Sequence, residues 1–475
     1  MIKPGRHIHF IGIGGIGMSG IASILLKQGY AVSGSDLKES PIIRRLAESG
    51  AGIFYGHSPA NINGADVVVY SSAIREDNPE LAYSRDKGLI VLRRAEALAS
   101  LMREKTCIAV SGAHGKTTTT ALASHLLLQT GFCPTAAIGG ILRNLEDNSC
   151  IGESRFFVAE ADESDGTFLC YNPEYPIVTN IDREHLDYYR DWEDILSAYK
   201  RFIGNMKETG CLFACGDDPA VRQVSSDFKK RVIYFGLSPD NDFYPRNIVL
   251  DEFSSSFDYC FSRAAGSRKT GSGKLVIRIN LPLSGRHNIS NSLAVIALGQ
   301  ELGISPEDIR KALASFQGTE RRFQLKADTG GIRLIDDYGH HPSEIRATLL
   351  AAKNVKHKRL IVAFQPHRYS RTKFLMEEFI QSLSLADILL ITDIYAASEE
   401  PIEGVSSEIL CEKIKEKFPA LEVLYLKKDR ITAMVLEMAR PGDLVITLGA
   451  GDIGKLSYEL AEGIKGKSSC QRAAV

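Results

Sequence analysis

The chain has 475 residues, of which 44% are hydrophobic and 24% are charged, a composition typical of globular proteins with two to four domains. A formal net charge of −1 excludes a whole-molecule attraction to nucleic acid or to anionic membranes, so neither is an expected partner. We find no secretory signal and no long apolar run, and therefore expect a cytoplasmic protein.

Strands and helices alternate along the first hundred or so residues. HIHFIGIG and AVSGSD are typical of strands, the segment GMSGIASILLKQGY between them is typical of a helix, and ADVVVYSSAI and GLIVLRR continue the series. Such alternation predicts a parallel sheet with helices on both faces. The helical segment AEALASLMREK ends this series near residue 104.

The glycine-rich loop GIGGIG, residues 12–17, lies between the first strand and the first helix. With Asp36 about 20 residues further on, it fits the pattern of dinucleotide-binding folds. The same geometry can hold any diphosphate over a helix N-terminus. The loop therefore predicts either an NAD-dependent dehydrogenase or a site for a nucleotide-linked substrate.

A second α/β series begins at TCIAVSGAHGKTT, and the stretch AVSGAHGKTTTT predicts a phosphate-binding loop. Gly112 and Gly115 permit a tight turn that exposes backbone N–H groups next to a helix N-terminus. Lys116 can contact the terminal phosphates of a nucleotide, and the hydroxyl of Thr117 can bind Mg²⁺. Val110 stands where the standard motif has glycine, so the loop is a shortened form. An ordinary strand-to-helix turn with an exposed lysine is the alternative.

Two polar residues that follow apolar strands are candidate Mg²⁺ ligands. Glu160 ends the strand-like segment RFFVAE, and His185 lies in VTNIDREHLD. Each residue alone could be a solvated polar group at a strand end. Together they suit oxygen-rich coordination with one added imidazole.

The second series ends near Gly318, and its residues 251–274 are rich in Ser and Gly and predict a hairpin. A third series contains GIRLIDD, KRLIVAF, ADILLITD and DLVITLGAG. The sequence therefore predicts an α/β protein of three domains, with boundaries at 1–104, 105–318 and 319–475.

Seven segments in order carry a resemblance to a known family: IHFIGIGGIGMSGIA, SGAHGKTTTT, EADESD, TNIDREHLD, SGRHNISNSLAV, DDYGHHPSEI and FQPHRYSRT. Over nearly the whole chain they resemble the Mur ligases of bacterial peptidoglycan synthesis. The first segment and the last two resemble the L-alanine-adding branch. The resemblance implies a Rossmann-like N-terminal domain for a UDP-linked substrate, a central P-loop-like ATPase domain, and a Rossmann-like C-terminal domain for an amino acid.

The activity implied by this resemblance is ATP-dependent ligation of L-alanine to the lactyl carboxylate of UDP-N-acetylmuramate through an acyl phosphate. The resemblance also implies two Mg²⁺ ions, which Mn²⁺ could replace, and a monomer or a homodimer. A recycling ligase that attaches a whole peptide to the same sugar nucleotide is the alternative within the family. A binding protein regulated by nucleotide, without turnover, is an alternative outside it.

Site residues follow from the resemblance motif by motif. The implied catalytic residues are Lys116, Glu160, His185, His340 and Arg371. The implied metal ligands are Thr117, Glu160 and His185. The implied ATP-binding residues are Gly112, His114, Gly115, Lys116, Thr117, Thr118, Asn180, His287, Asn288, Asn291, Arg322 and Asp337.

The substrate-binding residues follow in the same way. Those implied for the UDP moiety are Gly12, Gly14, Gly15, Gly17, Asp36, Ser71 and Ser72. Those implied for the amino acid are Tyr338, His340, His367, Arg368 and Arg371, with His340 or His367 as a candidate proton acceptor. Some members of the family use a carbamylated lysine, and Lys200 lies in the corresponding helix without being assigned that role.

Overall fold

The computed structural model describes residues 5–71, 73–185, 188–261, 274–397 and 399–473. None of the helices in these residues combines the length and the hydropathy needed to cross a bilayer. Contacts divide the chain into two compact units, each described here by itself. The first unit comprises Met1–Val249, Ser256–Pro282 and Arg286–Thr319, and the second comprises Leu250–Ser255, Leu283–Gly285 and Glu320–Val475.

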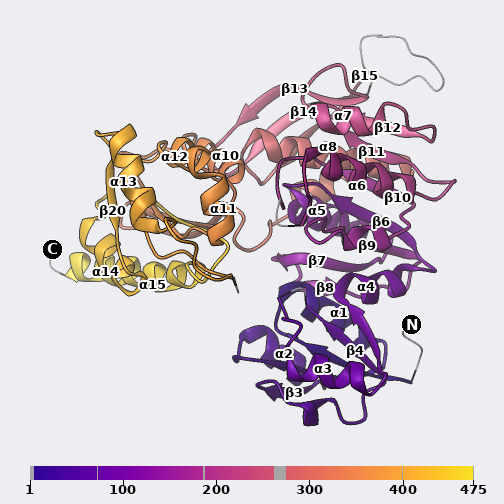
Figure 1. Ribbon diagram of the computed structural model, residues 1–475. Helices are drawn as coiled ribbons and strands as arrows, with labels where there is room; N and C mark the ends of the chain where they lie inside the picture. Colours follow the sequence, from indigo (N-terminus) through magenta and orange to yellow (C-terminus); the bar gives the residue numbers. More distant parts are fainter. Residues whose placement is uncertain (1–4, 72, 186–187, 262–273, 398, 474–475) are drawn as a thin grey trace. The chain divides into compact units, whose positions relative to one another are not determined.

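The first sheet has five parallel strands in the order β3-β2-β1-β4-β5. It belongs to the indigo, N-terminal part of the chain (Figure 1). The order reverses direction at β1, which creates a switch point where loops from neighbouring strands diverge. Its strands are β1 (His7–Ile11), β2 (Ala31–Asp36), β3 (Gly52–Tyr55), β4 (Val67–Tyr70) and β5 (Ile90–Arg93). Its helices are α1 (Ile16–Lys27), α2 (Pro41–Glu48), α3 (Pro79–Asp86) and α4 (Arg94–Met102), with the 3₁₀ turn η1 (Pro59–Ile62).

The second sheet has ten strands in the order β15-β14-β13-β12-β11-β10-β6-β9-β7-β8. Strand β6, an interior strand of this sheet, pairs in parallel with β10 and β9 and forms a second switch point. The strands are β6 (Thr106–Ser111), β7 (Thr135–Leu142), β8 (Asp147–Cys150), β9 (Phe156–Glu160), β10 (Tyr175–Val178), β11 (Leu212–Cys215), β12 (Val232–Phe235), β13 (Phe243–Leu250), β14 (Ser255–Phe261) and β15 (Lys274–Leu281).

The helices of this part are α5 (Lys116–Gln129), α6 (Trp192–Gly204), α7 (Pro219–Ser225), α8 (Arg286–Glu301) and α9 (Pro306–Ala314), with the 3₁₀ turn η2 (Thr167–Cys170). Helix α5 is buried along most of its length, which fits a central helix that carries the phosphate loop at its start. The predicted hairpin at 251–274 falls partly outside the described residues, which omit 262–273.

The third sheet forms the core of the second unit, in the order β16-β17-β21-β18-β19-β20. The β16–β17 pair is antiparallel and the other pairs are parallel. Its strands are β16 (Gln324–Thr329), β17 (Ile332–Asp337), β18 (Leu360–Phe364), β19 (Ile388–Ile391), β20 (Glu422–Tyr425) and β21 (Leu444–Leu448). Its helices are α10 (Pro342–Ala352), α11 (Tyr369–Phe374), α12 (Met376–Leu383), α13 (Ser407–Lys417), α14 (Lys428–Met438) and α15 (Gly454–Ala473).

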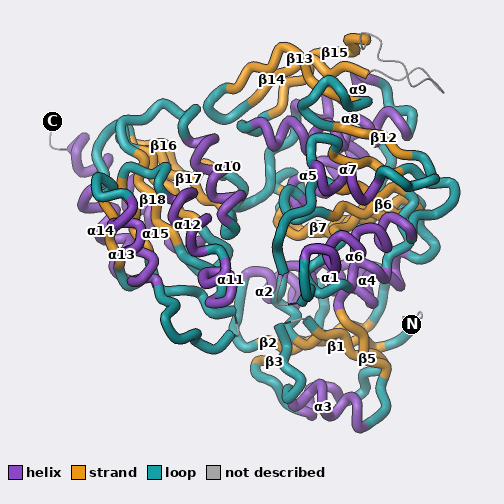
Figure 2. The backbone as a smooth tube through the Cα atoms, turned by 45° about the horizontal axis from the view of Figure 1, so that its top comes forward, coloured by secondary structure: helices purple, strands orange, loops and turns teal. Residues whose placement is uncertain are grey.

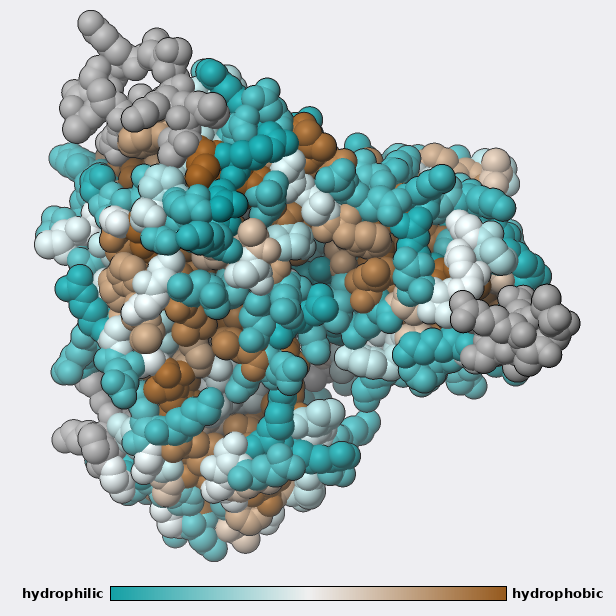
Figure 3. Space-filling view, turned by 180° about the vertical axis from the view of Figure 1, so that it is seen from behind, coloured by the Kyte–Doolittle hydropathy of each residue, from teal (hydrophilic) through white to brown (hydrophobic). Residues whose placement is uncertain are grey.

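Hydrophobic side chains on both faces of the third sheet are buried under helices (Figure 2). Leu334 and Ile335, consecutive on β17, belong to different core clusters because successive strand residues face opposite sides of a sheet. On the face drawn in Figure 3, hydrophilic residues are interspersed with hydrophobic ones. The predicted three-domain α/β fold is confirmed, whereas the boundaries at 104 and 318 stay predictions.

Candidate functional site

Two glycines give the loop between β6 and α5 its shape. Gly112 and Gly115 have φ values of +137° and +82°, which other residues rarely adopt. A Cβ atom on Gly112 would lie 3.0 Å from the backbone nitrogen of Asn180, and one on Gly115 would lie 2.7 Å from Oδ1 of Asn291. The loop therefore needs glycine at both positions, for conformation and for space.

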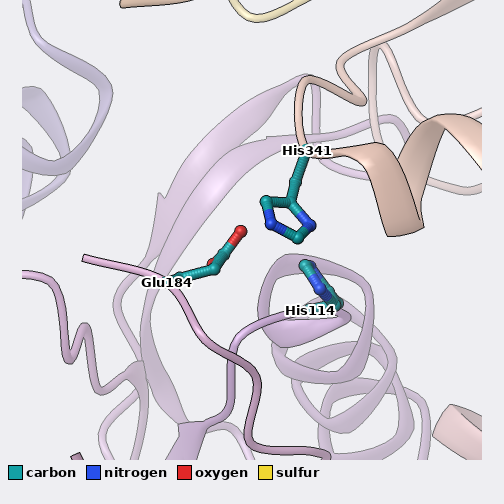
Figure 4. A group of neighbouring side chains, drawn as sticks. All are labelled: His114, Glu184 and His341. Atoms are coloured by element: carbon teal, nitrogen blue, oxygen red, sulfur yellow. The ribbon is translucent and has the colours of Figure 1, made fainter. Parts of the chain in front are cut away.

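Side chains that follow β10 hold the loop in place. The amide of Asn180 accepts a hydrogen bond from the His114 N–H at 2.7 Å and donates one to the His114 carbonyl at 3.0 Å. The hydroxyl of Thr179 donates to the same carbonyl at 2.6 Å. Figure 4 shows His114 on this loop and Glu184 on the loop after β10. In this structure Asn180 fixes the phosphate loop, and its predicted contact with adenine stays a prediction.

The ammonium group of Lys116 is turned back onto its own loop. Its Nζ lies 2.6 Å from the carbonyl oxygen of Gly112 and 3.2 Å from that of Ala113. It also lies 2.8 and 3.1 Å from the two carboxylate oxygens of Glu163, which is only 3% exposed. Lys116 and Glu163 thus form a largely buried ion pair beneath the loop.

The pKa values in this pair reflect opposing effects. Burial alone would lower the pKa of Lys116, but the carboxylates of Glu163 and Asp162 outweigh burial and raise it. Burial alone would raise the pKa of Glu163, but Lys116 and His185 outweigh it and lower that pKa. Both groups are therefore charged at neutral pH.

His185 lies beside the same carboxylate. Its Nε2 is 3.5 Å from Oε1 of Glu163 and 3.6 Å from Oε2 of Glu184, and its backbone has a φ of +58°. Burial would lower the pKa of His185, but these two carboxylates raise it. One ligand atom from each of Glu163, Glu184 and His185 lies within 4.8 Å of the others, close enough to share one cation.

Lys200 does not join this group, because its side chain is exposed on α6. The preceding residue, Tyr199, is 1% exposed and is the one that α6 turns inward. A carbamylated Lys200 therefore has no support in the structure.

Glu160 and Thr117 lie against two consecutive glycines of β7, Gly139 and Gly140. The Gly139 N–H donates to Oε1 of Glu160 at 2.8 Å, and a Cβ atom on Gly139 would lie 2.5 Å from that oxygen. A Cβ atom on Gly140 would lie 3.0 Å from Cγ2 of Thr117. The sequence GG in β7 thus leaves space for both predicted metal ligands, a role that the sequence analysis missed.

The predicted residues on α5 and α8 flank the loop. Thr117 and Thr118 are buried in the first turn of α5, and Asn288 and Asn291 are buried in the first turns of α8. His287 is exposed at the start of α8. The structure therefore places Asn291 against the loop through Gly115, while the predicted contacts of His287 and Asn288 with ATP stay predictions.

The glycine loop of the first sheet meets the ends of two neighbouring strands. The Gly14 N–H donates to Oδ2 of Asp36 at 2.9 Å, and a Cβ atom on Gly14 would lie 2.9 Å from that oxygen. A Cβ atom on Gly12, whose φ is +80°, would lie 3.6 Å from Cβ of Ser71. Gly15 is the N-cap of α1. The structure thus brings together the predicted residues at this edge, except Ser72, which lies outside the described residues.

Arg94 links this first loop to the acidic loop after β9. Its Nη2 lies 3.2 Å from Oδ2 of Asp162, and a Cβ atom on Gly17 would lie 3.0 Å from its Cδ. Burial would raise the pKa of Asp162, but Arg94 and Lys116 lower it. The roles of Asp162 and Glu163 in EADESD were not predicted, because only Glu160 stands at the end of a strand.

In the second unit, aromatic rings and arginines gather after β17 and β18. The His340 ring lies 5.6 Å from that of Tyr338 and 5.4 Å from that of His367, which is stacked on Tyr395 at 5.6 Å. Arg371 Nη1 donates to Nδ1 of His367 at 3.2 Å. Four of the residues predicted to bind the amino acid are thereby shown to be neighbours.

Both histidines are held neutral. Burial, with the positive charge of Arg371, places the pKa of His340 well below its usual value despite Glu344. Burial and the charges of Arg371 and Arg368 lower the pKa of His367 to about 3. Imidazoles in this state accept hydrogen bonds but are weak acceptors of a proton. Arg368, with a φ of +71°, lies 3.9 Å from Glu399.

The adjacent arginines of ERRF differ in their surroundings. Arg321 lies 3.1 Å from the buried carboxylate of Asp336 and donates to the Gly449 carbonyl at 2.6 Å. Arg322 is 28% exposed and lies 3.8 Å from Glu344. Both guanidinium groups lie over the ring of Tyr338, at 5.1 and 5.2 Å from its centroid. Arg321 is thus held by a buried carboxylate and a backbone carbonyl, whereas the ion pair of Arg322 is longer.

Asp337 holds the backbone around these groups. Its carboxylate accepts hydrogen bonds from the N–H groups of Phe323 at 2.7 Å and Gly339 at 2.8 Å. Burial raises its pKa, although Arg322 opposes this shift. His341, also drawn in Figure 4, is the N-cap of α10. The predicted contact of Asp337 with ATP stays a prediction.

Three family models match consecutive parts of the chain. The model of the Mur ligase family, catalytic domain, matches residues 7–106, the Mur ligase middle domain matches residues 110–299, and the Mur ligase, glutamate ligase domain, matches residues 321–451. Together these matches extend over most of the chain and include the phosphate loop, the acidic loop after β9, and Arg368 and Arg371.

Individual relatives agree with these matches. The UDP-N-acetylmuramate--L-alanine ligase of Desulfotalea psychrophila is 48% identical over 464 residues, which cover 97% of this chain and 99% of that protein. The crystal structure of UDP-N-acetylmuramate-alanine ligase MurC from Thermotoga maritima covers 97% of this chain and 100% of its own, with a TM-score of 0.82 and 29% identity. A murein peptide ligase from Psychrobacter arcticus, at 24% identity and a TM-score of 0.73 over 97% of this chain and 99% of its own, shows the fold alone.

The dehydrogenase interpretation of GIGGIG receives no support from these relatives. The predicted resemblance is confirmed by the three consecutive family models and by near-full-length identity to relatives. The chain belongs to the Mur ligase family.

Proposed function

We propose that this protein is an ATP-dependent ligase that joins L-alanine to the lactyl carboxylate of UDP-N-acetylmuramate, a step of peptidoglycan precursor synthesis. The observation that carries this proposal is the loop of Lys116, which stands at the switch point of the central sheet in a member of the Mur ligase family. A parallel sheet binds ligands at such points, and a helix N-terminus favours a phosphate there. We further propose the domain boundaries 1–104, 105–318 and 319–475.

A carboxylate is a poor electrophile, so the reaction needs an activated acid. In the proposed reaction a lactyl carboxylate oxygen attacks the γ-phosphorus of ATP in line, ADP leaves, and an acyl phosphate forms. The neutral amine of L-alanine then attacks the acyl carbon, and phosphate leaves with the oxygen that made the first attack. Lys116 and the N–H groups of its loop would bind the phosphates and offset the charge that builds up between two anions.

The donor set around the loop suits Mg²⁺, which prefers oxygen ligands. Thr117 and Glu160 share the space beside the two glycines of β7, and His185 lies among the carboxylates of Glu163 and Glu184. We propose that Thr117 and Glu160 hold one ion and that His185 takes part in holding a second. Mg²⁺, when bound, supplies positive charge to the phosphate oxygens.

The carboxylate of the amino acid must be held in a fixed position during ligation. We propose that Arg371 and Arg368 bind this carboxylate, since a guanidinium binds a carboxylate in a planar, bidentate way. Neutral His340, whose Nδ1 donates to the Tyr338 carbonyl, would accept a hydrogen bond from the amino group at Nε2. Neutral His367, whose Nδ1 accepts from Arg371, would instead offer its Nε2–H to the nitrogen lone pair. Because their pKa values are lowered, we expect their role to be orientation of the amine more than removal of its proton.

One substrate panel tests the function. Phosphate release is measured with ATP, Mg²⁺ and UDP-N-acetylmuramate, and with L-alanine, glycine, L-serine or a tripeptide as the amine. We expect release that depends on both the sugar nucleotide and a single amino acid, with L-alanine fastest, and a mass gain of one alanine residue in the product. Preference for the tripeptide would instead identify a recycling ligase, and release without any amine would contradict ligation.

Two lysine variants provide the matched comparison for this assay. Lys116→Met should abolish release, since it removes the charge proposed to bind the phosphates. Lys105→Met is the control. In the described residues the Lys105 ammonium group donates a hydrogen bond to the Ser154 carbonyl at 2.9 Å. This substitution should leave the rate of phosphate release within a few-fold of the parent. Equal rates for Lys116→Met and Lys105→Met would overturn the assignment of Lys116.

A further inference from the structure

The three protons of the Lys116 ammonium are already used within the protein. A lysine ammonium has three donors and no acceptor. Here Nζ lies within hydrogen-bond distance of the Gly112 carbonyl, the Ala113 carbonyl and the Glu163 carboxylate. A phosphate that is to bind Lys116 must therefore take the place of one of these partners.

Glu163 is the partner that can leave. The two carbonyls belong to the backbone of the loop, whose shape is set by Gly112 and by the hydrogen bonds of Thr179 and Asn180. The backbone of Glu163 is also fixed, because its carbonyl accepts hydrogen bonds from the Tyr189 hydroxyl at 2.6 Å and from the Gly166 N–H at 3.0 Å. Movement of its side chain, in contrast, would leave this backbone in place, and His185 lies 3.5 Å from its Oε1 as a second partner.

The negative charge of Glu163 makes its replacement by a phosphate at Lys116 dependent on cations. Glu163 is buried, so its negative charge is poorly screened, and a triphosphate arriving at Lys116 would meet it at short range. Repulsion between the carboxylate and the phosphate opposes binding unless positive charge is added. A divalent cation that accompanies the nucleotide would supply that charge.

We infer that Glu163 is the internal counter-ion of Lys116, which the terminal phosphates of ATP displace, and that its charge makes tight ATP binding dependent on a divalent cation. This inference rests on the proposed function only in that it takes the loop of Lys116 to bind ATP. In the absence of nucleotide, Glu163 holds the lysine in the loop and compensates its charge. Glu163 is in this sense a positioning residue for Lys116.

The neighbouring Asp162 offers a matched control. It is one residue away and also acidic, but its carboxylate is paired with Arg94 at 3.2 Å, and no hydrogen bond to Lys116 is described for it. Glu163→Gln and Asp162→Asn each remove one negative charge from the same loop. The inference predicts that the first change alters the metal dependence of ATP binding more than the second, because Asp162 also acts on Lys116 through its charge but is compensated by Arg94.

The experiment is calorimetric titration of the full-length protein with ATP, in EDTA and in excess Mg²⁺. In EDTA, Glu163→Gln should bind ATP about tenfold or more tightly than the parent, the effect of removing one unscreened charge at close range. Asp162→Asn should change this affinity less than Glu163→Gln does, because Arg94 already compensates the Asp162 carboxylate. The ratio of the dissociation constants without and with Mg²⁺ should fall in Glu163→Gln because binding in EDTA becomes tighter. A fall caused by weaker binding in Mg²⁺ would instead indicate loss of a cation ligand and would contradict the inference.

The remaining outcomes are decisive as well. If Glu163→Gln binds ATP in EDTA as the parent does, or more weakly, the inference is wrong. If the parent itself binds no ATP with Mg²⁺ present, the proposed function fails first. Should Glu163→Gln not fold, Glu163→Ala serves instead: it also removes the negative charge, and an ATP affinity in EDTA unchanged from the parent would overturn the inference.

Discussion

Arg371 donates a hydrogen bond to Nδ1 of His367 across 3.2 Å, which leaves that nitrogen without a proton. Burial and this neighbouring charge lower the pKa of His367 to about 3. We therefore expect no titration of the His367 ring between pH 5 and pH 8 in side-chain NMR spectra, and an upward shift of its pKa in Arg371→Met.

The lowered pKa of His367 also predicts that the protein becomes less stable as the pH falls. The folded-state pKa of His367 lies below its unfolded value of about 6.5, so the contribution of this residue to stability is complete above that pH and is lost as pH falls towards 3. An NMR inflection near pH 6.5 for His367 in the parent protein would contradict the described pair.

Gly115→Ala should weaken both the fold and nucleotide binding. A residue other than glycine at a φ of +82° costs about 1–2 kcal/mol, and the added methyl group would press on the Asn291 side chain. Gly131→Ala is the control, because Gly131 has a φ of +78° at the other end of α5, with nothing within 4 Å of its Cβ position. Both variants should lose similar stability in thermal unfolding, but only Gly115→Ala should bind ATP more weakly. Equal ATP affinities would show that Asn291 adapts.

Glu80 provides a test of stability against pH. Its buried carboxylate lies 2.5 Å from the Ser35 hydroxyl, 2.6 Å from the Asn61 amide and 3.6 Å from Nε2 of His9. Burial opposes the charge, but these partners lower the pKa of Glu80 to about 2. The stabilisation, up to about 3 kcal/mol, is therefore present above pH 4.5 and lost as pH falls to about 2.

Thermal unfolding at several pH values checks this prediction. Glu80→Gln should lower the Tm at pH 7 and flatten its fall below pH 4.5. The control Glu76→Gln alters an exposed residue paired with Arg85 and should leave the Tm nearly unchanged. Parallel curves for Glu80→Gln and the parent over this range would show that the Glu80 cluster does not carry the acid sensitivity.

The two arginines of ERRF should separate stability from activity. Arg321→Met leaves the buried Asp336 carboxylate without its guanidinium, which should cost about 2–4 kcal/mol of unfolding free energy. Arg322→Met should cost less than about 0.5 kcal/mol and still slow ligation, if Arg322 contacts ATP as proposed. Chemical denaturation and phosphate release measure the two effects. Normal turnover in Arg322→Met would remove this arginine from the ATP site.

The sequence predicts the fold well because alternating strands and helices have few ways to pack. GAHGKTTTT also predicts its own local structure, since glycine conformations and the helix start are set within the segment. The partners of Lys116 are different. EADESD holds four carboxylates, and their order alone does not tell which one turns towards the lysine after the chain folds.

For other residues of the site, the sequence does not show which side of a helix or loop faces the protein interior. Tyr199 and Lys200 are adjacent on α6, yet the helix turns one inward and the other into solvent. In ERRF, only the tertiary contacts of Asp336 and Gly449 distinguish Arg321 from Arg322. A one-residue error in alignment exchanges these roles, and the sequence offers no local signal to detect it.

The central claim is that the γ-phosphoryl group of ATP passes to the lactyl carboxylate. Its most direct test uses UDP-N-acetylmuramate labelled with ¹⁸O in that carboxylate, with mass spectrometry of the phosphate released during ligation to L-alanine. The proposed acyl phosphate requires one ¹⁸O atom in each phosphate. Ligation at full rate with unlabelled phosphate would contradict it.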